Sequence, residues 1–475
     1  MTADLVRCSA TLAAKDGDAD VLWLREVTTQ CQLWDERILV PSSLTQLGCK
    51  AMTGLSLVPF MYVLGSSASP TLSGRSAIPF SPGFDISAVL SLAVSLPSHS
   101  WEFGTASEAL LELYDAPYSV YGEKPFPIPW LSPSPHSRVY SPALDYAKQN
   151  IVIGTPPNGL SDGDGAVGDP ASLGVVALLL GVGDEKYRVA AEEEIDYLLE
   201  GAPRWHNGAV SHRAAYAELW ADFIYMAPPF LAYYGAAMSN ATVLRAAVEQ
   251  CRLYHQVLLT NTTSPAYSPA KQPQSTAGLW VHIVGPENAD PGLWSTGNAW
   301  AAAGMMRVLA TVLKAGSTLS SSWRHTAIAD LTRMITDILD AAIRLQPQVQ
   351  IEGYGGGGKD KGLLRNYLDD ETWFGEISGS TLLASVAYRL VSTPGISLSK
   401  KDTRRYIAFA ESIRLLLGER DAEGEGMYVS KNGTVAPAVN PLGWGDRTPY
   451  TAGSPEGQNF VVLMYAAWRD WKQNQ

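Results

Sequence analysis

The chain of 475 residues has a formal net charge of −12, and its 46% hydrophobic and 17% charged residues indicate a globular protein, not a disordered chain or a coiled coil. Its length exceeds that of a disulfide-stapled mini-domain and allows one large core or about two to three ordinary domains. Because phosphate binding needs a basic face and no cluster of Lys or Arg supplies one, nucleic acid is not expected as a partner.

Residues 1–100 are predicted to form an N-terminal extension or cover segment of irregular structure, since they are rich in Ser, Thr, Leu and Pro and show weak helical periodicity. No N-terminal signal peptide is recognisable, because Asp16, Asp18 and Asp20 lie where an apolar run would be needed. Secreted and cytoplasmic locations both stay open. The apolar stretch 51–65 is too short to span a bilayer, so no membrane association is expected.

Three patterns hint at ligand sites without completing them. The four cysteines contain no C-x-x-C pair, so no zinc site is predicted; a Cys31–Cys49 disulfide is one reading and buried free thiols are the favoured one. Segment 353–360 nearly spells a phosphate-binding loop, but Asp360 replaces its final Ser or Thr, which favours a flexible loop over a cleft. Segment 162–165 lacks the later ligands of a calcium loop and is predicted to be a turn.

Helices dominate the chain from residue 101 onward, and Asp169 can cap one of them with Pro170 at its first position. About 375 residues at about 30 per helix and loop give about twelve helices, the number in an (α/α)6 toroid of six hairpins around a central cleft. An α-solenoid would give a similar count, but no internal repeat supports it. The sequence therefore predicts an all-α (α/α)6 barrel over residues 101–475. The predicted helices span residues 101–114, 170–180, 184–199, 214–234, 242–259, 296–314, 323–345, 378–391, 401–417 and 455–471.

Asp222 is the most informative polar residue, because it lies in a strongly apolar predicted helix beside Trp220, Phe223 and Met226. An unpaired carboxylate there would cost several kcal/mol, so Asp222 must be paired, neutral or at the mouth of a cavity. Desolvation and a second nearby carboxylate would raise its pKa, which suits a general acid near neutral pH. A helix cap or a buried, hydrogen-bonded Asp is the alternative reading.

Five segments together resemble the unsaturated glycuronyl hydrolases of glycoside hydrolase families 88 and 105, with the stronger likeness to family 105, the unsaturated rhamnogalacturonyl hydrolases. The likeness follows the family order over residues 100–470, and its most specific part is W-x-D-x-x-[FY]-M-x-x-P-F-L. The segments are HNGAVSHR at 206–213, ELWADFIYMAPPFLAYYG at 218–235, WSTGNAW at 294–300, YLDDETWFGEISGS at 367–380 and SPEGQNFVVLMYAA at 454–467.

The resemblance implies an (α/α)6 barrel, in agreement with the helix count, and a small acidic oligosaccharide as substrate, of the kind that lyases release from rhamnogalacturonan or pectin. Such substrates end in a uronic acid with a C4=C5 double bond. Protonation at C4 and attack of water at C5 give an unstable hemiketal, which opens and releases the neighbouring sugar. This chemistry requires no enzyme nucleophile, metal ion or organic cofactor.

By position, the resemblance implies two catalytic carboxylates: Asp222 as the acid/base, and Asp169 as the group that helps to keep Asp222 partly protonated. The other implied residues bind the substrate, with Arg213 facing its carboxylate and Trp side chains stacking on its rings. They are His212, Arg213, Trp220, His282, Trp294, Asn298 and Trp300. Any one of the Trp residues could equally lie in the core, Trp300 above all.

One position departs from the family pattern, which usually reads W-x-R-G-N-x-W with the Arg directed at the substrate; here it is Thr296. A hydroxyl cannot replace the bidentate contact of a guanidinium with a carboxylate. Either Arg213 or another cation takes over, or the acidic sugar lies differently, or the activity is weakened. Two alternatives therefore stay open: another (α/α)6 carbohydrate hydrolase or lyase, and a sugar-binding pseudoenzyme. The linkage, the aglycone sugar and the oligomeric state stay undetermined.

Overall fold

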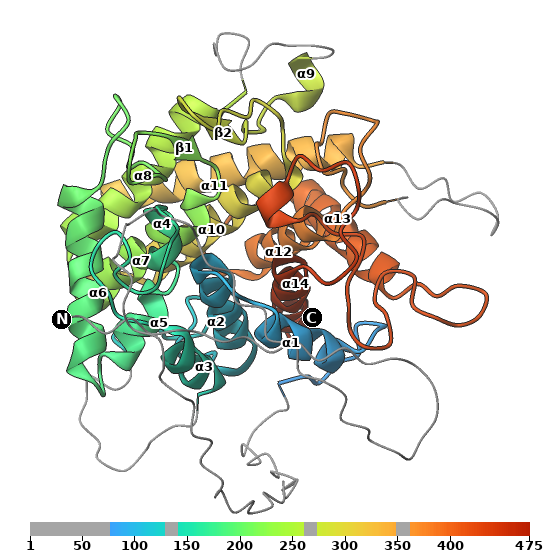
Figure 1. The fold of residues 1–475 in the computed structure, drawn as a ribbon, viewed down its shortest axis with the longest axis horizontal. Coiled ribbons are helices and arrows are strands. Elements are labelled where there is room, and N and C mark those ends of the chain that lie inside the picture. The colour runs from blue at the N-terminus through green and yellow to red at the C-terminus, as the bar shows by residue number, and fades with distance from the viewer. Residues whose placement is uncertain (1–76, 129–140, 261–272, 348–361) are drawn as a thin grey trace, which may run out of the picture. The chain divides into compact units, whose positions relative to one another are not determined.

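The computed structural model describes residues 77–128, 141–260, 273–347 and 362–475, which belong to one compact unit, Leu72–Gln475 (Figure 1). The possible Cys31–Cys49 disulfide and the predicted flexible loop 353–360 lie outside these residues. The elements are α1 (Ile86–Ser95), α2 (Ser100–Tyr114), α3 (Pro142–Asn150), α4 (Gly168–Ala171), α5 (Gly174–Leu180), α6 (Glu185–Asp196), β1 (Leu219–Trp220), α7 (Phe223–Ala237), α8 (Ala241–Leu258), α9 (Pro273–Thr276), β2 (Ile283–Val284), α10 (Ser295–Lys314), α11 (Ser321–Leu345), α12 (Ile377–Ser392), α13 (Lys400–Leu417) and α14 (Pro455–Gln473), with a π-helical turn at Tyr197–Gly201 and 3-10 turns at Gly316–Thr318 and Pro441–Gly443.

Six of these helices form a closed inner ring. Helices α2, α5, α7, α10, α12 and α14 each contact the next, and α14 returns to α2. Each inner helix has an outer partner: α3 packs on α2, α6 on α5, α8 on α7, α11 on α10, α13 on α12, and α1 on α14. Figure 1 shows the outer helices α3, α6, α8, α11 and α13 at the periphery of this ring. Six hairpins around a closed ring confirm the predicted (α/α)6 barrel.

The sequence of each helix fits its layer. Outer α8 buries only the stripe that includes Leu244, Val248 and Cys251, as expected for an amphipathic helix on a surface. Inner α10 buries its side chains on all sides and is therefore rich in Ala and Gly. A Cβ atom at Gly304 would lie 2.0 Å from the carbonyl oxygen of Ile224, so the glycine lets α7 and α10 approach closely.

Two predicted helices differ from the structure at their starts. The helix predicted over 214–234 begins only at Phe223, because 219–220 form β1 and pair antiparallel with β2, Trp220 opposite Ile283. Pairing with a segment some sixty positions away leaves no trace in local periodicity. The helix predicted over 170–180 is divided into α4 and α5. Helices α1 and α3 were not predicted; α1 lies before residue 101, and Asp85 caps it by accepting hydrogen bonds from two main-chain N–H groups.

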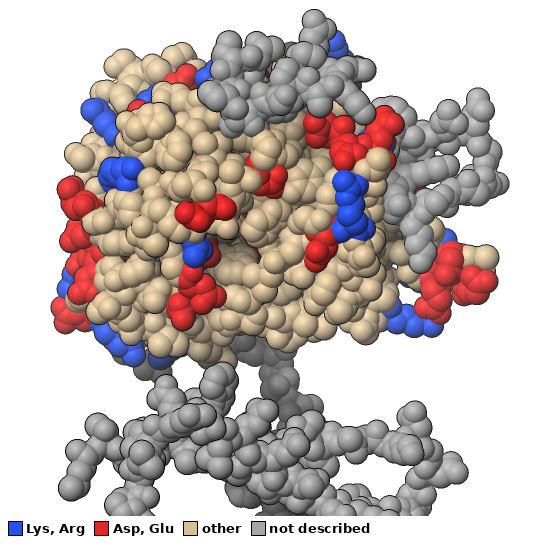
Figure 2. Space-filling view, turned by 45° about the horizontal axis from the view of Figure 1, so that its top comes forward, with Lys and Arg blue, Asp and Glu red and all other residues tan. Residues whose placement is uncertain are grey.

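The surface of the described unit carries no extended basic patch on the face drawn in Figure 2, where Lys and Arg side chains are scattered among Asp and Glu. Within the described ranges, no helix has both the length and the apolar character needed to cross a membrane.

Candidate active site

A cavity of about 150 Å³ brings together seven of the nine predicted site residues: Asp169, His212, Arg213, Trp220, Asp222, His282 and Trp294. Asn298 and Trp300 do not line it. Its full lining consists of those seven and of Trp101, Gly163, Asp164, Met226, Pro441, Leu442, Trp444 and Glu456.

The cavity lies where the inner helices begin. Trp101 and Glu456 are the second residues of α2 and α14, Asp169 is the second residue of α4, Asp222 directly precedes α7, and Trp294 directly precedes α10. Helix N-termini carry unsatisfied N–H groups and a partial positive charge. An anionic ligand is therefore favoured at this end of the barrel, even though the chain is acidic overall.

Asp222 occupies the N-cap position of α7, but its side chain makes no capping hydrogen bond. The helix-cap reading of the sequence is therefore wrong, and the carboxylate faces the cavity. Its Oδ2 atom is buried and lies 3.3 Å from Nε2 of His282, a close charged contact in which neither atom completes a hydrogen bond within the described residues. A buried oxygen without a hydrogen-bond donor lowers the stability of the folded protein, and such oxygens are often found where a group contacts a ligand.

His282 is held between two carboxylates. Its Nδ1 lies 3.0 Å from Oδ2 of Asp290, which also accepts a 2.6 Å hydrogen bond from the Tyr367 hydroxyl, while Asp290 Oδ1 accepts one from the N–H of Gly292. Burial lowers the pKa of His282, but the charges and contacts of Asp222 and Asp290 outweigh burial and raise it overall. When the imidazole is protonated, it stabilises a negative charge on Asp222.

Asp169 and His212 form a second close pair in the cavity lining, with His212 Nε2 3.9 Å from Asp169 Oδ1. Burial and the nearby Asp222 carboxylate raise the pKa of Asp169 to about 8, against a smaller opposing effect of Arg213. The charge of Asp222 thus contributes to a raised pKa at Asp169. Burial lowers the pKa of His212 to about 4, so this ring is neutral near neutral pH.

Arg213 is a free cation at the cavity. Its Nη2 donates a 2.8 Å hydrogen bond to the main-chain oxygen of Asp164, and its guanidinium forms no ion pair with any carboxylate in the described part of the chain. Thr296, by contrast, is fully buried and donates a 3.3 Å hydrogen bond to Glu376, the N-cap of α12. The hydroxyl at position 296 thus faces the helix start and not the cavity, which leaves Arg213 as the guanidinium that lines it.

Aromatic rings form much of the remaining lining. Trp220 stacks on His212 with ring centroids 4.7 Å apart, and its Nε1 donates to buried Glu218 at 2.7 Å. Trp444 comes from a distant loop and lies 5.4 Å from Trp220 by ring centroids. Asn366 fixes the other indole, since its Oδ1 accepts from Trp294 Nε1 at 2.8 Å. Flat aromatic faces beside charged groups suit a ring that has both C–H faces and polar edges.

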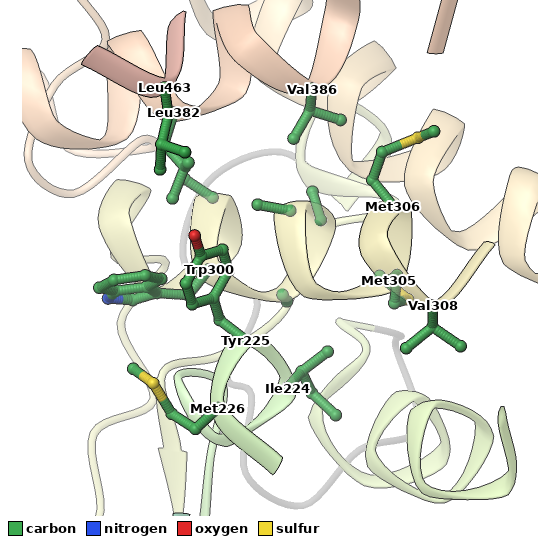
Figure 3. Close-up of a cluster of buried hydrophobic side chains, with 14 of the residues drawn as sticks. Ile224, Tyr225, Met226, Trp300, Met305, Met306, Val308, Leu382, Val386 and Leu463 are labelled. Carbon is green, nitrogen blue, oxygen red and sulfur yellow. The ribbon is translucent and has the colours of Figure 1, made fainter. Parts of the chain in front are cut away.

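Asn298 and Trp300 have structural positions, contrary to their predicted contact with a substrate. Asn298 is buried, and its amide bonds both main-chain groups of Trp280 and the carbonyl of Trp294. It positions the loop that carries the indole of Trp294. Trp300 lies in the core beside Tyr225 (Figure 3). Its ring centroid is 4.5 Å from that of Tyr225 and 4.5 Å from that of Phe460.

Trp300→Ala is expected to lower the free energy of unfolding by about 3–5 kcal/mol, because it removes a fully buried indole and leaves a cavity between α7, α10 and α14. Denaturant unfolding measures this loss. Trp300→Phe retains most of the ring contacts and should cost less. A rise in KM without loss of stability in Trp300→Phe would instead mean that Trp300 contacts the substrate.

Sequence reasoning missed four residues of the site: Asp290, Trp444, Trp101 and Glu456. Glu456 lies in the segment 454–467, which carries part of the family resemblance, and Trp101 is the first residue of a predicted helix. Their positions at the starts of predicted helices were therefore the signal that could have identified them. Asp290 and Trp444 lie in loops and carry no local signal. No group of three or more His, Cys, Asp or Glu residues in the described ranges could hold a metal ion.

Comparison with known proteins gives a consistent family signal. Residues 171–348 match the model of Glycosyl Hydrolase Family 88. The unsaturated rhamnogalacturonyl hydrolase YesR of Bacillus subtilis (strain 168) is 25% identical over 211 residues, which are 43% of this chain and 52% of YesR. The chain therefore spans about half the length of this curated relative.

Solved structures show the same fold. A possible member of the GH105 family from Salmonella enterica subsp. enterica serovar Paratyphi A aligns with a TM-score of 0.56 at 14% identity, covering 86% of this chain and 99% of that one. A family 105 glycoside hydrolase from C. acetobutylicum ATCC 824 aligns with a TM-score of 0.52 at 15% identity, covering 81% and 97%. Likeness at this identity establishes the six-hairpin architecture.

Proposed function

Because the chain belongs to the unsaturated glycuronyl hydrolases of glycoside hydrolase families 88 and 105, we propose that it hydrates the C4=C5 double bond of a terminal unsaturated uronic acid and thereby releases the neighbouring sugar. One observation carries the proposal: Oδ2 of Asp222, which lies 3.3 Å from His282 Nε2 and has no hydrogen-bond partner among the described residues, lies at a cavity that the Asp169 carboxyl also lines.

The proposed reaction uses one proton held by the pair Asp169 and Asp222. Two neighbouring carboxyls in a buried site do not readily ionise together, so the pair retains a proton near neutral pH. The proton passes from the Asp169 carboxyl to Asp222, which delivers it to C4 while the C4=C5 electron pair forms the new C–H bond. The carboxylate then accepts a proton from the water that attacks C5, which restores the starting state of the pair.

The hemiketal formed at C5 needs no further catalytic group. Its ring opens when the C5–O bond to the ring oxygen breaks, which leaves a hemiacetal at C1, and this collapses to an aldehyde and the released sugar. The glycosidic oxygen leaves with the released sugar. Atoms balance as one water added per molecule of substrate.

Two features support an acidic ring in the cavity. Arg213 offers a guanidinium without a carboxylate partner among the described residues, and the N-termini of the inner helices add partial positive charge. The finer assignment, a rhamnogalacturonan-type fragment as substrate, rests on the relative YesR and on the resemblance of the motifs.

A panel of unsaturated disaccharides tests the proposed function. The purified protein is incubated with unsaturated rhamnogalacturonyl and unsaturated glucuronyl disaccharides while the ultraviolet absorbance of the conjugated acid is followed. We expect the absorbance to fall as free sugar appears in equal amount, with the higher kcat/KM on the rhamnogalacturonyl substrate. Binding without turnover would favour a pseudoenzyme, and cleavage of saturated substrates alone would favour an ordinary hydrolase.

Asp290→Asn is expected to lower kcat by about 10- to 100-fold, because the amide no longer stabilises the protonated ring of His282 and so disturbs the charge next to Asp222. Tyr367→Phe removes only the hydroxyl that donates to Asp290 and should cost a few-fold at most. Steady-state kinetics of both variants check this order. A wild-type kcat in Asp290→Asn would show that the charge of His282 does not affect proton transfer by Asp222.

A further inference from the structure

Glu456 lines the cavity beside the carboxyl groups of Asp164, Asp169 and Asp222, and the reaction proposed above does not use it. It is the second residue of α14, and only 3% of the residue is exposed. Its Oε1 accepts a 3.1 Å hydrogen bond from the indole Nε1 of Trp101. Its Oε2 is buried and has no hydrogen-bond partner among the described residues. An unpartnered polar atom that lines a cavity points to a ligand contact.

The surroundings of Glu456 favour its neutral form. No described Lys, Arg or His forms an ion pair with it, although Arg213 and His282 line the same cavity. The charges that shift its pKa are acidic: Asp222 before α7, Glu102 on α2 and Glu376 before α12. Burial is the main cause that raises the pKa of Glu456 far above its usual range, and these three carboxylates add to it.

The hydrogen bond from Trp101 determines which oxygen of the neutral Glu456 carboxyl carries the proton. Oε1 already accepts from the indole, so it is the carbonyl-type oxygen, and the proton belongs on Oε2. A protonated Glu456 therefore presents an O–H donor on the side where none of the described residues supplies an acceptor.

From this geometry we propose that Glu456 is a specificity-determining residue, which donates a hydrogen bond from its neutral carboxyl to an acceptor oxygen of the acidic sugar in the cavity. The inference rests on the proposed function. It also explains how a cavity lined by four carboxyl groups and one guanidinium can bind an anion, because an uncharged Glu456 does not repel the acidic ring. An O–H donor to a carboxylate oxygen is a strong hydrogen bond that a cationic or purely apolar ligand cannot use.

Two substitutions at position 456 separate a neutral donor from a charged group. Glu456→Gln keeps the shape, accepts from Trp101 through its amide oxygen and donates through its amide nitrogen, so KM should stay within about threefold of wild type. Glu456→Met keeps the bulk and loses the donor, so KM should rise about tenfold or more while kcat changes less. Glu456→Asp should raise KM similarly, because the shorter acid withdraws its donor; it replaces the Met variant if that variant does not fold.

Glu194 provides a matched control. It is fully buried on α6, burial raises its pKa to about 8, and both its oxygens lack hydrogen-bond partners among the described residues, yet it does not line the cavity. Glu194→Met should therefore change stability without changing KM.

Three results would overturn the inference: a KM in Glu456→Gln raised as far as in Glu456→Met, a wild-type KM in Glu456→Met, or failure of Glu456→Gln to fold, since the amide can make both hydrogen bonds of the neutral acid. If the wild-type protein turns over no unsaturated substrate, the proposed function itself fails and the inference falls with it. Normal wild-type turnover with any of the three results rejects the inference alone.

Discussion

Asp222→Asn is expected to lower kcat by at least about 1,000-fold, because the amide can neither deliver a proton to C4 nor accept one from the attacking water. Both half-steps of the proposed reaction pass through this one carboxyl. Steady-state kinetics on an unsaturated disaccharide, followed by loss of the conjugated-acid absorbance, measure the change.

The variant should fold normally, since no hydrogen bond holds the Oδ2 atom of Asp222 in the described structure. Removing the charge relieves the repulsion of Asp169 but also removes the partner of His282, so the melting temperature should stay close to that of the wild type. Asp145→Asn, the same chemical change at an exposed position of α3, is the matched control and should retain wild-type kcat. If Asp222→Asn retained more than a tenth of the wild-type activity, Asp222 would not be the acid/base of the reaction.

Asp169→Asn is expected to lower kcat by about 100-fold or more and to abolish the alkaline decline of the pH profile. In the wild type the Asp169 carboxyl, with its pKa raised to about 8, holds a proton below that pH and loses it above. Activity should therefore fall as the pH rises through about 8, because the pair with Asp222 no longer has a proton to deliver. The amide carries no such proton at any pH. Measurement of kcat/KM against pH for both proteins checks the prediction.

The effect of Asp169 on protein stability distinguishes the expected loss of activity above about pH 8 from a loss caused by unfolding. An Asp in the unfolded chain has a pKa of about 3.9, so between that pH and about 8 the folded wild type binds a proton that the unfolded chain does not. The contribution of Asp169 to stability therefore decreases as the pH rises across this window. Asp169→Asn lacks this penalty and should be at least as stable as the wild type at the alkaline end. A decline centred near pH 8 that persists in Asp169→Asn would assign the titration to another group.

The barrel was predictable because its signals are local. Ten of the twelve barrel helices carry a recognisable apolar pattern of their own, and the number of residues per helix and loop pointed to six hairpins without any knowledge of the contacts. The start of α7 was not predictable, because β1 depends on pairing between Trp220 and Ile283 across the chain. Helix α1 was not predicted because it is short, its start is marked only by Asp85, and the surrounding sequence is rich in Ser and Pro.

The candidate site was predictable only in part, for a related reason. The motifs contain Asp222, Asp169 and His282, but the charge balance among them depends on burial and on tertiary neighbours. Asp290 gives no signal in the sequence, although it shares His282 with Asp222. Trp300 shows the opposite error, since a Trp in a site motif still packs in the core when its helix turns it inward.

The central claim is that the protein adds water across C4=C5 and does not attack the glycosidic bond itself. The most direct measurement compares two disaccharides of the same linkage in deuterium oxide, one ending in the unsaturated uronic acid and the other in its saturated counterpart. The proposed mechanism predicts turnover of the unsaturated substrate alone, loss of its conjugated-acid absorbance, and one deuterium at C4 of the first product detected by mass spectrometry. Cleavage of the saturated substrate at a comparable rate, or release of sugar without deuterium at C4, would contradict it.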